Sequence, residues 1–193
     1  MALLATANRG KLEELKSLFA GTALELAMPA DAGIVLPPVE ETGATFRENA
    51  LLKARSLAAA SRGWALADDS GLEVDALGGE PGVHSARYAG PEATDAGNVA
   101  KLLAALRGVT DRRARFRCVL ALAGPDGRTL VAEGVFEGSI ATEPAGSGGF
   151  GYDPVFVVPG LGKTVAQLPF GGKQRISHRA RAAAALRELL ATI

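Results

Sequence analysis

Residues 3–19 read LLATANRGKLEELKSLF and hold the pattern that decides the fold. The apolar run Leu3-Leu4-Ala5 predicts a short strand. After Asn8-Arg9-Gly10, which is typical of a tight turn, apolar residues recur at the spacing of a helix, at Leu12, Leu15, Leu18 and Phe19. A strand that passes through a turn directly into a helix favours an α/β protein.

The rest of the chain continues with strands and helices. Thr45 and Glu48 form a capping box, which predicts a helix that runs to about Arg62. Residues 64–67 predict a second short strand, which we expect to end at Asp68-Asp69-Ser70-Gly71. Further expected elements are a helix at 99–106, an antiparallel hairpin of 116–123 and 130–136, a strand at 154–158 and a helix capped by Ser177. This order predicts an α/β fold with a long mixed sheet, and no linker divides residues 1–193 into separate domains.

The composition limits the partners that the protein can have. With 193 residues, of which 48% are hydrophobic, the chain has enough apolar material for one compact domain. Its 21 basic and 21 acidic residues cancel, so no global field draws it to a nucleic acid polymer or to an anionic membrane. The single cysteine, Cys118, fits a reducing compartment. Because no segment has the pattern of a signal peptide or a membrane span, we expect a cytoplasmic protein.

The turn Thr6-Ala7-Asn8-Arg9-Gly10-Lys11 is a candidate phosphate site. Backbone amides at a helix N-terminus and a lysine both favour an anion there. The turn lacks the glycine spacing and the terminal Lys-Ser/Thr of a Walker loop. The alternative is that Asn8 only caps the helix and that Lys11 is a solvated residue of its first turn.

Two acidic segments form a candidate magnesium site. Asp68-Asp69 follows an apolar strand, and Glu40-Glu41 lies upstream. One Glu and one Asp from separate segments would suffice, because magnesium takes a few carboxylates together with waters and phosphate oxygens. A remaining carboxylate could activate a water molecule. Alternatively, the adjacent aspartates only cap a turn.

Two segments near the C-terminus contain side chains suited to a nucleotide. Lys173, His178 and Arg179 combine hydrogen-bond donors with positive charge, which suits a phosphate or a purine carbonyl. Phe150-Gly151-Tyr152-Asp153 follows a glycine-rich run and offers a ring for stacking and a carboxylate for N–H groups. The alternative for Phe150 is a place in the core, and His84 is expected to be structural.

Together these segments resemble the inosine/xanthosine triphosphate pyrophosphatase family, also described as non-standard purine NTP pyrophosphatases. The resemblance rests on motifs that follow one another along nearly the whole chain, at residues 5–11, 41–46, 49–54, 67–75, 78–83, 85–88, 148–154 and 177–179. It implies an elongated α/β fold with a mixed central sheet flanked by helices, two lobes around a central nucleotide-binding cleft, and a homodimer.

The resemblance also implies an activity and the residues that carry it. The family hydrolyses nucleoside triphosphates, a small-molecule substrate, to the monophosphate and pyrophosphate, with Mg²⁺ as cofactor. By this resemblance Glu41 and Asp69 hold magnesium, Asp69 is the proton acceptor, and Lys53 adds positive charge at the catalytic site. The nucleotide would be bound by Thr6, Ala7, Asn8, Arg9, Gly10, Lys11, Ser70, Phe150, Gly151, Tyr152, Asp153, Lys173, His178 and Arg179.

The expected function is therefore the removal of ITP, dITP and XTP, which keeps deaminated purines out of DNA and RNA. One alternative is a pyrophosphatase for modified pyrimidine nucleotides on a related fold. Another is a nucleotide-binding sensor without catalysis, although such a protein would have no need to keep Lys11, Glu41, Lys53 and Asp69 together. A phosphatase with a covalent aspartyl intermediate would need a different motif around Asp68-Asp69.

Overall fold

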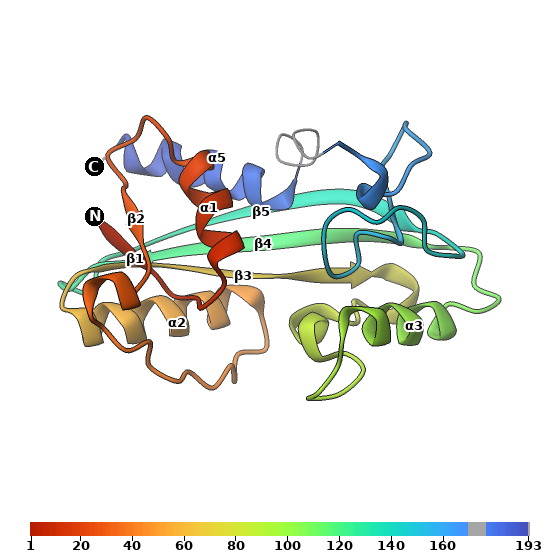
Figure 1. The fold of residues 1–193 in the computed structure, drawn as a ribbon, viewed down its shortest axis with the longest axis horizontal. Coiled ribbons are helices and arrows are strands. Elements are labelled where there is room, and N and C mark those ends of the chain that lie inside the picture. The colour runs from red at the N-terminus through yellow and green to blue at the C-terminus, as the bar shows by residue number, and fades with distance from the viewer. Residues whose placement is uncertain (170–176, 193) are drawn as a thin grey trace. The chain divides into compact units, whose positions relative to one another are not determined.

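The computed structural model describes residues 1–169 and 177–192. Its described strands form one sheet in the order β2 (Leu26–Ala27), β1 (Ala2–Leu4), β3 (Trp64–Val74), β4 (Arg113–Ala123), β5 (Thr129–Ile140) and β6 (Phe156–Val157), as Figure 1 shows. β1 pairs in parallel with both β2 and β3, whereas β5 and β6 are antiparallel. The sheet is therefore mixed, and the predicted α/β fold with helices beside a mixed sheet is confirmed.

Contacts between residues divide the chain into two compact units. Unit 1 comprises Met1–Asp69, Cys118–Gly134 and Arg179–Ile193, and unit 2 comprises Ser70–Arg117 and Val135–His178. Each unit is thus assembled from stretches that are far apart in the sequence, and β3, β4 and β5 contribute residues to both.

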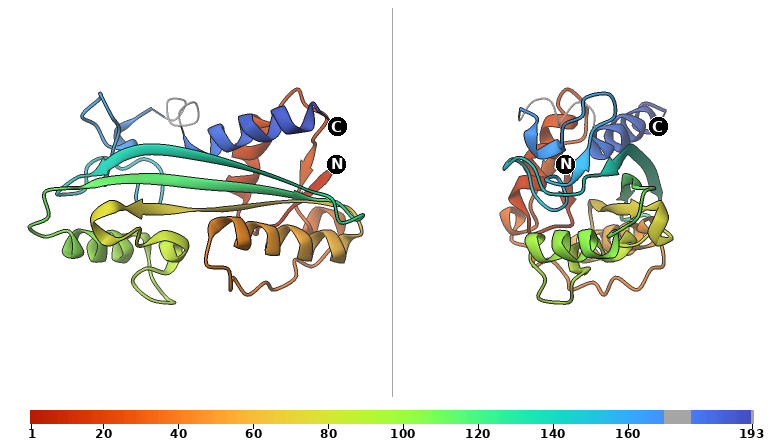
Figure 2. Two further views of the ribbon diagram at one scale, coloured as in Figure 1. Left: turned by 180° about the vertical axis from the view of Figure 1, so that it is seen from behind. Right: turned by 90° about the vertical axis from the view of Figure 1, so that its right-hand side faces the viewer.

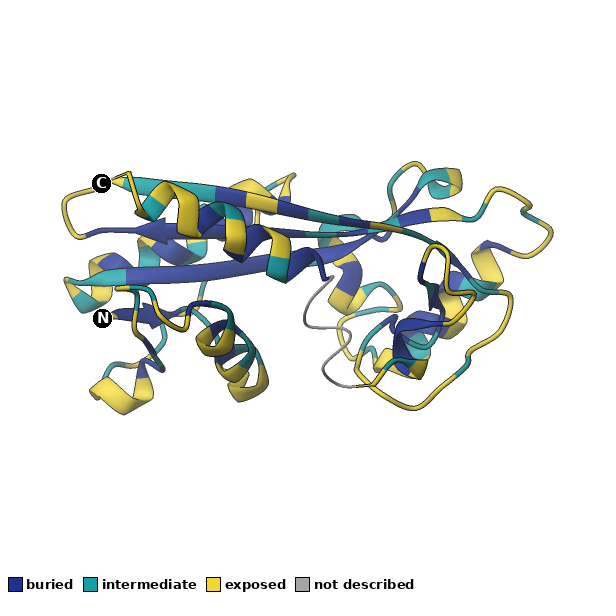
Figure 3. Ribbon diagram, turned by 90° about the horizontal axis from the view of Figure 1, so that it is seen from above, coloured by how far each residue is buried: buried dark blue, intermediate teal, exposed yellow. Residues whose placement is uncertain are grey.

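In unit 1, helices cover both faces of the sheet. α1 (Arg9–Leu18) and α5 (His178–Leu190) lie on one face, and α2 (Phe46–Ser61) lies on the other (Figures 1 and 2). Leucines from α1, α5 and the sheet form one buried cluster, which includes Leu4, Leu12, Leu15, Leu66, Leu120 and Leu186. In Figure 3 the strands are mostly buried, whereas the helices are exposed along one side.

The helix starts follow from the local sequence. The Asn8 side chain accepts a hydrogen bond from the Lys11 amide at 3.2 Å and caps α1. Thr45 and Glu48 form the predicted capping box at the start of α2. Such caps satisfy amides that have no partner within the helix, so they fix where the chain enters each helix.

Unit 2 contains α3 (Asp95–Ala105), the short helices η2 (Asp75–Leu77), η3 (Gly82–Arg87) and η4 (Val165–Gln167), and the strand β6. A second buried cluster supports it and includes Leu72, Leu102, Phe116, Phe136, Tyr152 and Phe156. Residues 124–128 connect β4 to β5 where the hairpin is predicted, and the Gly124 amide donates to the Arg128 carbonyl. The hairpin strands are longer than predicted, and β6 is shorter.

The prediction that a short strand ends before Asp68 is wrong. β3 continues through Asp68-Asp69-Ser70-Gly71 to Val74. Pairing with the neighbouring strands outweighs the local preference of these residues for a turn. Among the described residues, none of the helices combines the length and the apolar content needed to cross a membrane.

Candidate active site

Asp68 and Asp69 lie within β3, and neighbouring residues of a strand point to opposite faces of the sheet. Asp68 contacts Lys11 of α1 and Arg179 of α5. Asp69 contacts Lys53 of α2, on the other face. The strand therefore separates two adjacent carboxylates into two clusters, both formed by residues of unit 1.

The Asp69 cluster consists of Asp69, Lys53 and Glu41. Lys53 Nζ lies 2.5 Å from Asp69 Oδ1 and 3.0 Å from Glu41 Oε1. The Asp69 and Lys53 side chains are only 10% and 16% exposed. One ammonium group thus joins two carboxylates that would otherwise repel each other.

Burial and charge act against each other in this cluster. Burial raises the pKa of Asp69, and the charges of Glu41 and Asp68 add to this effect, while Lys53 opposes it. Burial alone would lower the pKa of Lys53, but Asp69 and Glu41 outweigh it and raise the pKa. Lys53 is therefore charged at neutral pH, and Asp69 is a stronger base than an ordinary aspartate.

The segment that carries Glu41 is held by Asn49 of α2. The Gly43 amide donates to Asn49 Oδ1 at 2.8 Å. A Cβ atom on Gly43 would lie 2.6 Å from this oxygen, so glycine permits the close approach. Asn49 is fully buried, and its Nδ2 has no hydrogen-bond partner among the described residues. Asn49 and Lys53 are four residues apart on one face of α2, so one helix positions both Glu41 and Lys53.

The Asp68 cluster contains three further charged groups. Asp68 Oδ1 accepts from Lys11 Nζ at 2.9 Å, and Asp68 Oδ2 accepts from Arg179 Nε at 2.7 Å. Arg179 Nη1 also donates to Glu14 Oε2 at 2.9 Å. Cys118, which is buried as predicted, places its Sγ 3.4 Å from Asp68 Oδ2.

Opposite charges keep the Asp68 cluster ionised. Burial alone would raise the pKa of Asp68, but Arg179 and Lys11 lie so close that the pKa falls well below its ordinary value. Burial alone would lower the pKa of Arg179, but Asp68, with Cys118 and Glu14, raises it. A fixed carboxylate in this place orients Lys11 rather than exchanging protons.

The predicted phosphate turn lies beside this cluster. Thr6 Oγ1 accepts from the Asn8 amide at 3.1 Å, and Asn8 in turn caps α1. Ala7, Asn8, Arg9 and Gly10 are exposed, and Lys11 is half-buried. Asn8 therefore caps the helix, as the alternative stated, whereas Lys11 is not simply solvated but belongs to a charged cluster.

In unit 2, the loop around Phe150 presents an aromatic ring. Phe150 is 55% exposed, whereas Tyr152 and Asp153 are buried. Asp153 Oδ2 accepts from the Phe150 amide at 3.0 Å, and Asp95 Oδ2 accepts from the Gly151 amide at 2.7 Å. Two carboxylates therefore anchor the loop on both sides of the exposed ring.

The other residues considered from the sequence lie in different parts of the fold. His178 is buried in unit 2 and stacks on Phe116, with ring centroids 5.0 Å apart. Ser70 is half-buried on β3, and Lys173 lies outside the described residues. His84 is exposed on η3. Arg179 is only 2% exposed and bound to two carboxylates.

Three residues that hold candidate site segments were given no role from the sequence. They are Glu14, which binds Arg179, Asn49, which holds the Gly43 amide, and Asp95, which holds the Gly151 amide. A signal exists for Glu14, because it lies three residues after Lys11 and thus on the same face of α1. Asp95 gives no such signal, since it is also an ordinary first-turn residue of a helix.

The Asp69 cluster fits a magnesium ion that also binds phosphate. In the part of the chain that the structure describes, no three His, Cys, Asp or Glu side chains gather that could hold a metal. Magnesium usually takes one or two carboxylates and completes its shell with waters and substrate phosphates. Glu41 and Asp69 supply such a pair, at a place where a positive charge already binds both.

The fold and the two clusters define an α/β protein that combines carboxylates with lysines, as phosphoryl-transfer sites do. The chain belongs to the Ham1 family, whose model matches residues 2–189. The dITP/XTP pyrophosphatase of Methylococcus capsulatus is 55% identical over 95% of this chain and 92% of its own length. That of Escherichia coli is 50% identical over 93% of this chain and 92% of its own.

Solved structures agree with this assignment. A HAM1 protein from Coxiella burnetii superimposes with a TM-score of 0.92 at 43% identity and covers all of both chains. The Ham1 protein of Staphylococcus aureus gives a TM-score of 0.89 at 45% identity, over 99% of this chain and 98% of its own. The resemblance stated from the motifs is therefore confirmed at the level of the family and its fold.

Proposed function

We propose that this protein hydrolyses the non-standard purine nucleoside triphosphates ITP, dITP and XTP to the monophosphate and pyrophosphate. The observation that carries the proposal is the Asp69 cluster, in which Lys53 joins a buried Asp69 and Glu41. The proposal is supported by relatives named dITP/XTP pyrophosphatase that are 50–55% identical over nearly the whole chain. In a cell this activity cleanses the nucleotide pool of deaminated purines.

The proposed cofactor is Mg²⁺, held by Glu41 and Asp69. When bound there, magnesium supplies positive charge to the phosphate oxygens. Lys53 lies against both carboxylates and fixes their positions through contacts of 3.0 and 2.5 Å. Lys11, with the turn Thr6–Gly10, binds the phosphate chain from the N-terminus of α1.

Asp69 is the proposed general base. Its carboxylate lies in the cluster proposed to hold magnesium, where it can accept the proton of a water molecule. The water oxygen forms a bond to the α-phosphorus. The bond between this phosphorus and the oxygen that bridges to the β-phosphate breaks, and pyrophosphate leaves with the bonding electrons. The proton of the water passes to Asp69, while Lys11 and Lys53 stabilise the negative charge on the phosphate oxygens.

Base recognition is assigned to Phe150 and the residues that resemble the family's nucleotide-binding set. The exposed Phe150 ring is available to stack on a purine. The proposed nucleotide-binding set also includes Ser70, Gly151, Tyr152, Asp153, Lys173, His178 and Arg179. A pocket that donates to the six-oxygen rejects adenine, because an exocyclic amine would leave buried donors without an acceptor.

Three broader features complete the proposal. We treat residues 1–193 as a single functional domain that acts as a homodimer. The substrate is a free nucleotide rather than a nucleic acid polymer, and a membrane is not needed. Because the proposed substrates belong to the nucleotide pool, the enzyme would act in the cytoplasm.

A product assay tests the proposal. Purified protein with magnesium is given ITP, dITP, XTP, ATP, GTP and a modified pyrimidine triphosphate separately, and pyrophosphate and orthophosphate are measured. We expect pyrophosphate chiefly from ITP, dITP and XTP. Pyrophosphate chiefly from the pyrimidine would refute the purine assignment, orthophosphate would refute the reaction, and binding without turnover would identify a sensor.

A further inference from the structure

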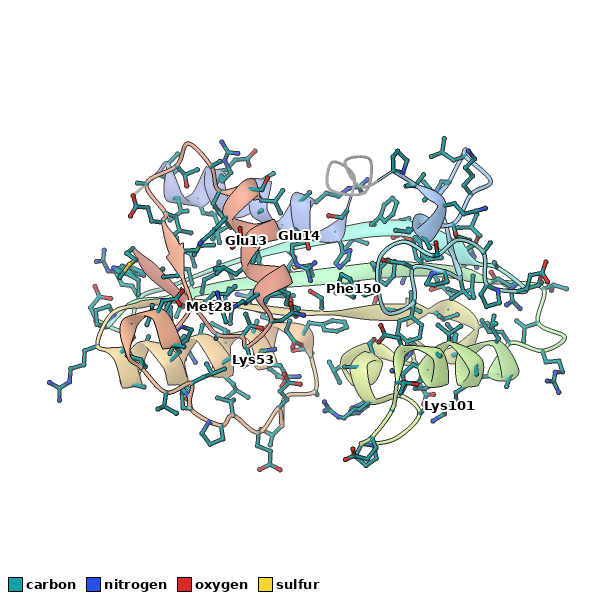
Figure 4. All side chains as sticks on the ribbon, in the orientation of Figure 1. Glu13, Glu14, Met28, Lys53, Lys101 and Phe150 are labelled. Carbon is teal, nitrogen blue, oxygen red and sulfur yellow. The ribbon has the colours of Figure 1, made fainter. Side chains whose placement is uncertain are left out.

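Four side chains of alternating charge form a continuous chain on the α1 and α5 face of unit 1. Glu14 accepts from Arg179 Nη1 at 2.9 Å, and Arg179 Nε donates to Asp68 at 2.7 Å. Asp68 Oδ1 then accepts from Lys11 Nζ at 2.9 Å. We call Glu14, Arg179, Asp68 and Lys11 the charge chain. It begins and ends on α1, as Figure 4 shows for Glu14.

The burial of the charge chain calls for a functional explanation. The Arg179 and Asp68 side chains are 3% and 2% exposed. Removing two charges from water is costly, and well-packed apolar residues often give equal or greater stability. The two residues therefore contribute a defined geometry more than stability.

Lys11 is the end of the charge chain that reaches solvent. Its side chain is 27% exposed, compared with 2% for its partner Asp68. It lies in the first turn of α1, where the proposed phosphate site is. A lysine side chain is flexible, so a fixed carboxylate beside its ammonium group reduces the entropy lost when it binds an anion.

The Arg179 guanidinium is already bound through each of its three nitrogen atoms. Nε and Nη2 contact Asp68 at 2.7 and 3.5 Å, and Nη1 contacts Glu14. An arginine in this state holds Asp68 in place, and Glu14 holds the arginine. These contacts use three of the five guanidinium N–H groups, and they connect Glu14 through Arg179 and Asp68 to Lys11.

We propose that Glu14 and Arg179 are positioning residues that fix Lys11 for the phosphate chain of the substrate. This inference rests on the proposed function. Without the Glu14 charge, Arg179 Nη1 keeps at most a neutral acceptor in place of a carboxylate, and the guanidinium competes more strongly with Lys11 for Asp68 Oδ1. Lys11 is then less restrained and binds phosphate less well, whichever base the nucleotide carries.

A double-mutant cycle with Glu14→Gln and Lys11→Met tests the proposal. The affinity for inorganic pyrophosphate, which has no base, is measured by calorimetry in magnesium buffer for the four proteins. We expect Glu14→Gln to weaken binding about tenfold in the wild-type background, the size of one coupling within a shared network. In the Lys11→Met background the same change should have less than a twofold effect.

Glu13→Gln is the matched control, because it removes the same charge from the neighbouring position of α1. Glu13 is 73% exposed and pairs only weakly with Lys16, at 3.7 Å, and Figure 4 shows it beside Glu14. Glu14→Asp keeps the charge and should recover most of the affinity. If the Glu14→Gln protein does not fold, the affinity of Glu14→Asp still tests the proposal. An equal effect of Glu14→Gln in both backgrounds, or no difference from Glu13→Gln, would overturn the proposal.

A measurement without nucleotide separates this proposal from the proposed function. Trace acylation of amines, read by peptide mass spectrometry, compares Lys11 with Lys16 on the same helix. Lys11 should react several-fold faster in Glu14→Gln than in wild type or Glu13→Gln, because its ion pair with Asp68 is weakened. An unchanged rate contradicts the charge chain, even if the enzyme acts on the expected nucleotides.

Discussion

Lys53 Nζ lies 2.5 Å from Asp69 Oδ1, and the same ammonium group reaches Glu41 at 3.0 Å. In the protein alone, Lys53 thus lies between the two carboxylates that we assign to magnesium. Removing the Lys53 ammonium group leaves the Glu41 and Asp69 carboxylates near each other without this cation.

We therefore expect Lys53→Met to destabilise the protein in the presence of a chelator. A loss of about 2 kcal/mol, between the values for breaking an exposed and a buried ion pair, corresponds to a fall in Tm of about 4–8 °C for a chain of this size. Magnesium should then raise the Tm of the variant more than that of wild type. Lys16→Met, a change on an exposed lysine of α1, is the control, and equal magnesium effects in all three proteins would contradict the interpretation.

Asp69→Asn tests the general base. An amide keeps the size of the side chain but cannot accept the proton of water, so turnover should fall about a hundredfold or more. Nucleotide binding should change by only a few-fold. Steady-state kinetics and calorimetry with ITP measure the two effects, and near-normal turnover would remove Asp69 from the mechanism.

Asp95→Ala tests how the Phe150 ring is held. Asp95 Oδ2 accepts from the Gly151 amide at 2.7 Å, and losing this bond should loosen the loop. We expect KM for ITP to rise roughly five- to tenfold, which corresponds to the loss of about 1 to 1.4 kcal/mol from one exposed hydrogen bond, with little change in kcat. Asp95→Asn retains an acceptor and should lie near wild type. If inorganic pyrophosphate, which has no base, also bound less tightly to Asp95→Ala, the effect would not be confined to the Phe150 loop.

The buried hydroxyl of Tyr152 should make the free energy of unfolding fall at alkaline pH. Burial raises the pKa of Tyr152 far above 10, and the charges of Tyr88 and Asp95 add to this effect. Above pH 10 the unfolded chain therefore releases a proton that the folded protein keeps, so the free energy of unfolding falls by about 1.4 kcal/mol per pH unit. Below pH 10 this contribution is fully present.

Denaturant unfolding between pH 8 and 11 measures this effect. Tyr152→Phe should lose about 1 kcal/mol at pH 8, because the hydroxyl no longer donates to the Ser85 carbonyl. Its stability should then decline less steeply than that of wild type above pH 10. Tyr88→Phe is the control with the less buried phenol, and a parallel decline of Tyr152→Phe and wild type would refute the assignment.

The parts of the fold that depend on local sequence were predictable. Asn8 and the Thr45–Glu48 box cap their helices as expected, because a cap involves residues only three positions apart. The continuation of β3 past Asp68 to Val74 was not predictable in this way. Ser70-Gly71 has the composition of a turn, and only its pairing within the sheet keeps it extended.

In the candidate site, too, local sequence predicts some features but not the contacts between distant segments. Asp69, Lys53 and Glu41 were assigned from motifs, and the structure brings them together. The roles of Asp68 and Asp69 differ because they point to opposite faces of β3, which becomes evident once the strand is known to continue past them. The ligands of Arg179 come from residues more than a hundred positions away, and no periodic pattern indicates such a contact.

Close packing explains one further requirement of the Phe150 loop. Gly149 has a φ of +76°, and a Cβ atom there would collide with the Asp153 carboxylate. The glycine-rich run was expected to bring the backbone close to a ligand or to another chain segment. At this position it approaches the side chain that anchors Phe150.

Asp68 and Arg179 are 111 positions apart in the chain, yet they form the centre of the charge chain. A ribosome that adds about 5–20 residues per second delivers the arginine roughly 5 to 20 seconds after the aspartate. During this interval the nascent chain carries Asp68 with Lys11 but without its arginine partner, and α5 has not yet covered its face of the sheet. The charge chain, although three of its four residues are encoded early, is therefore completed last during synthesis.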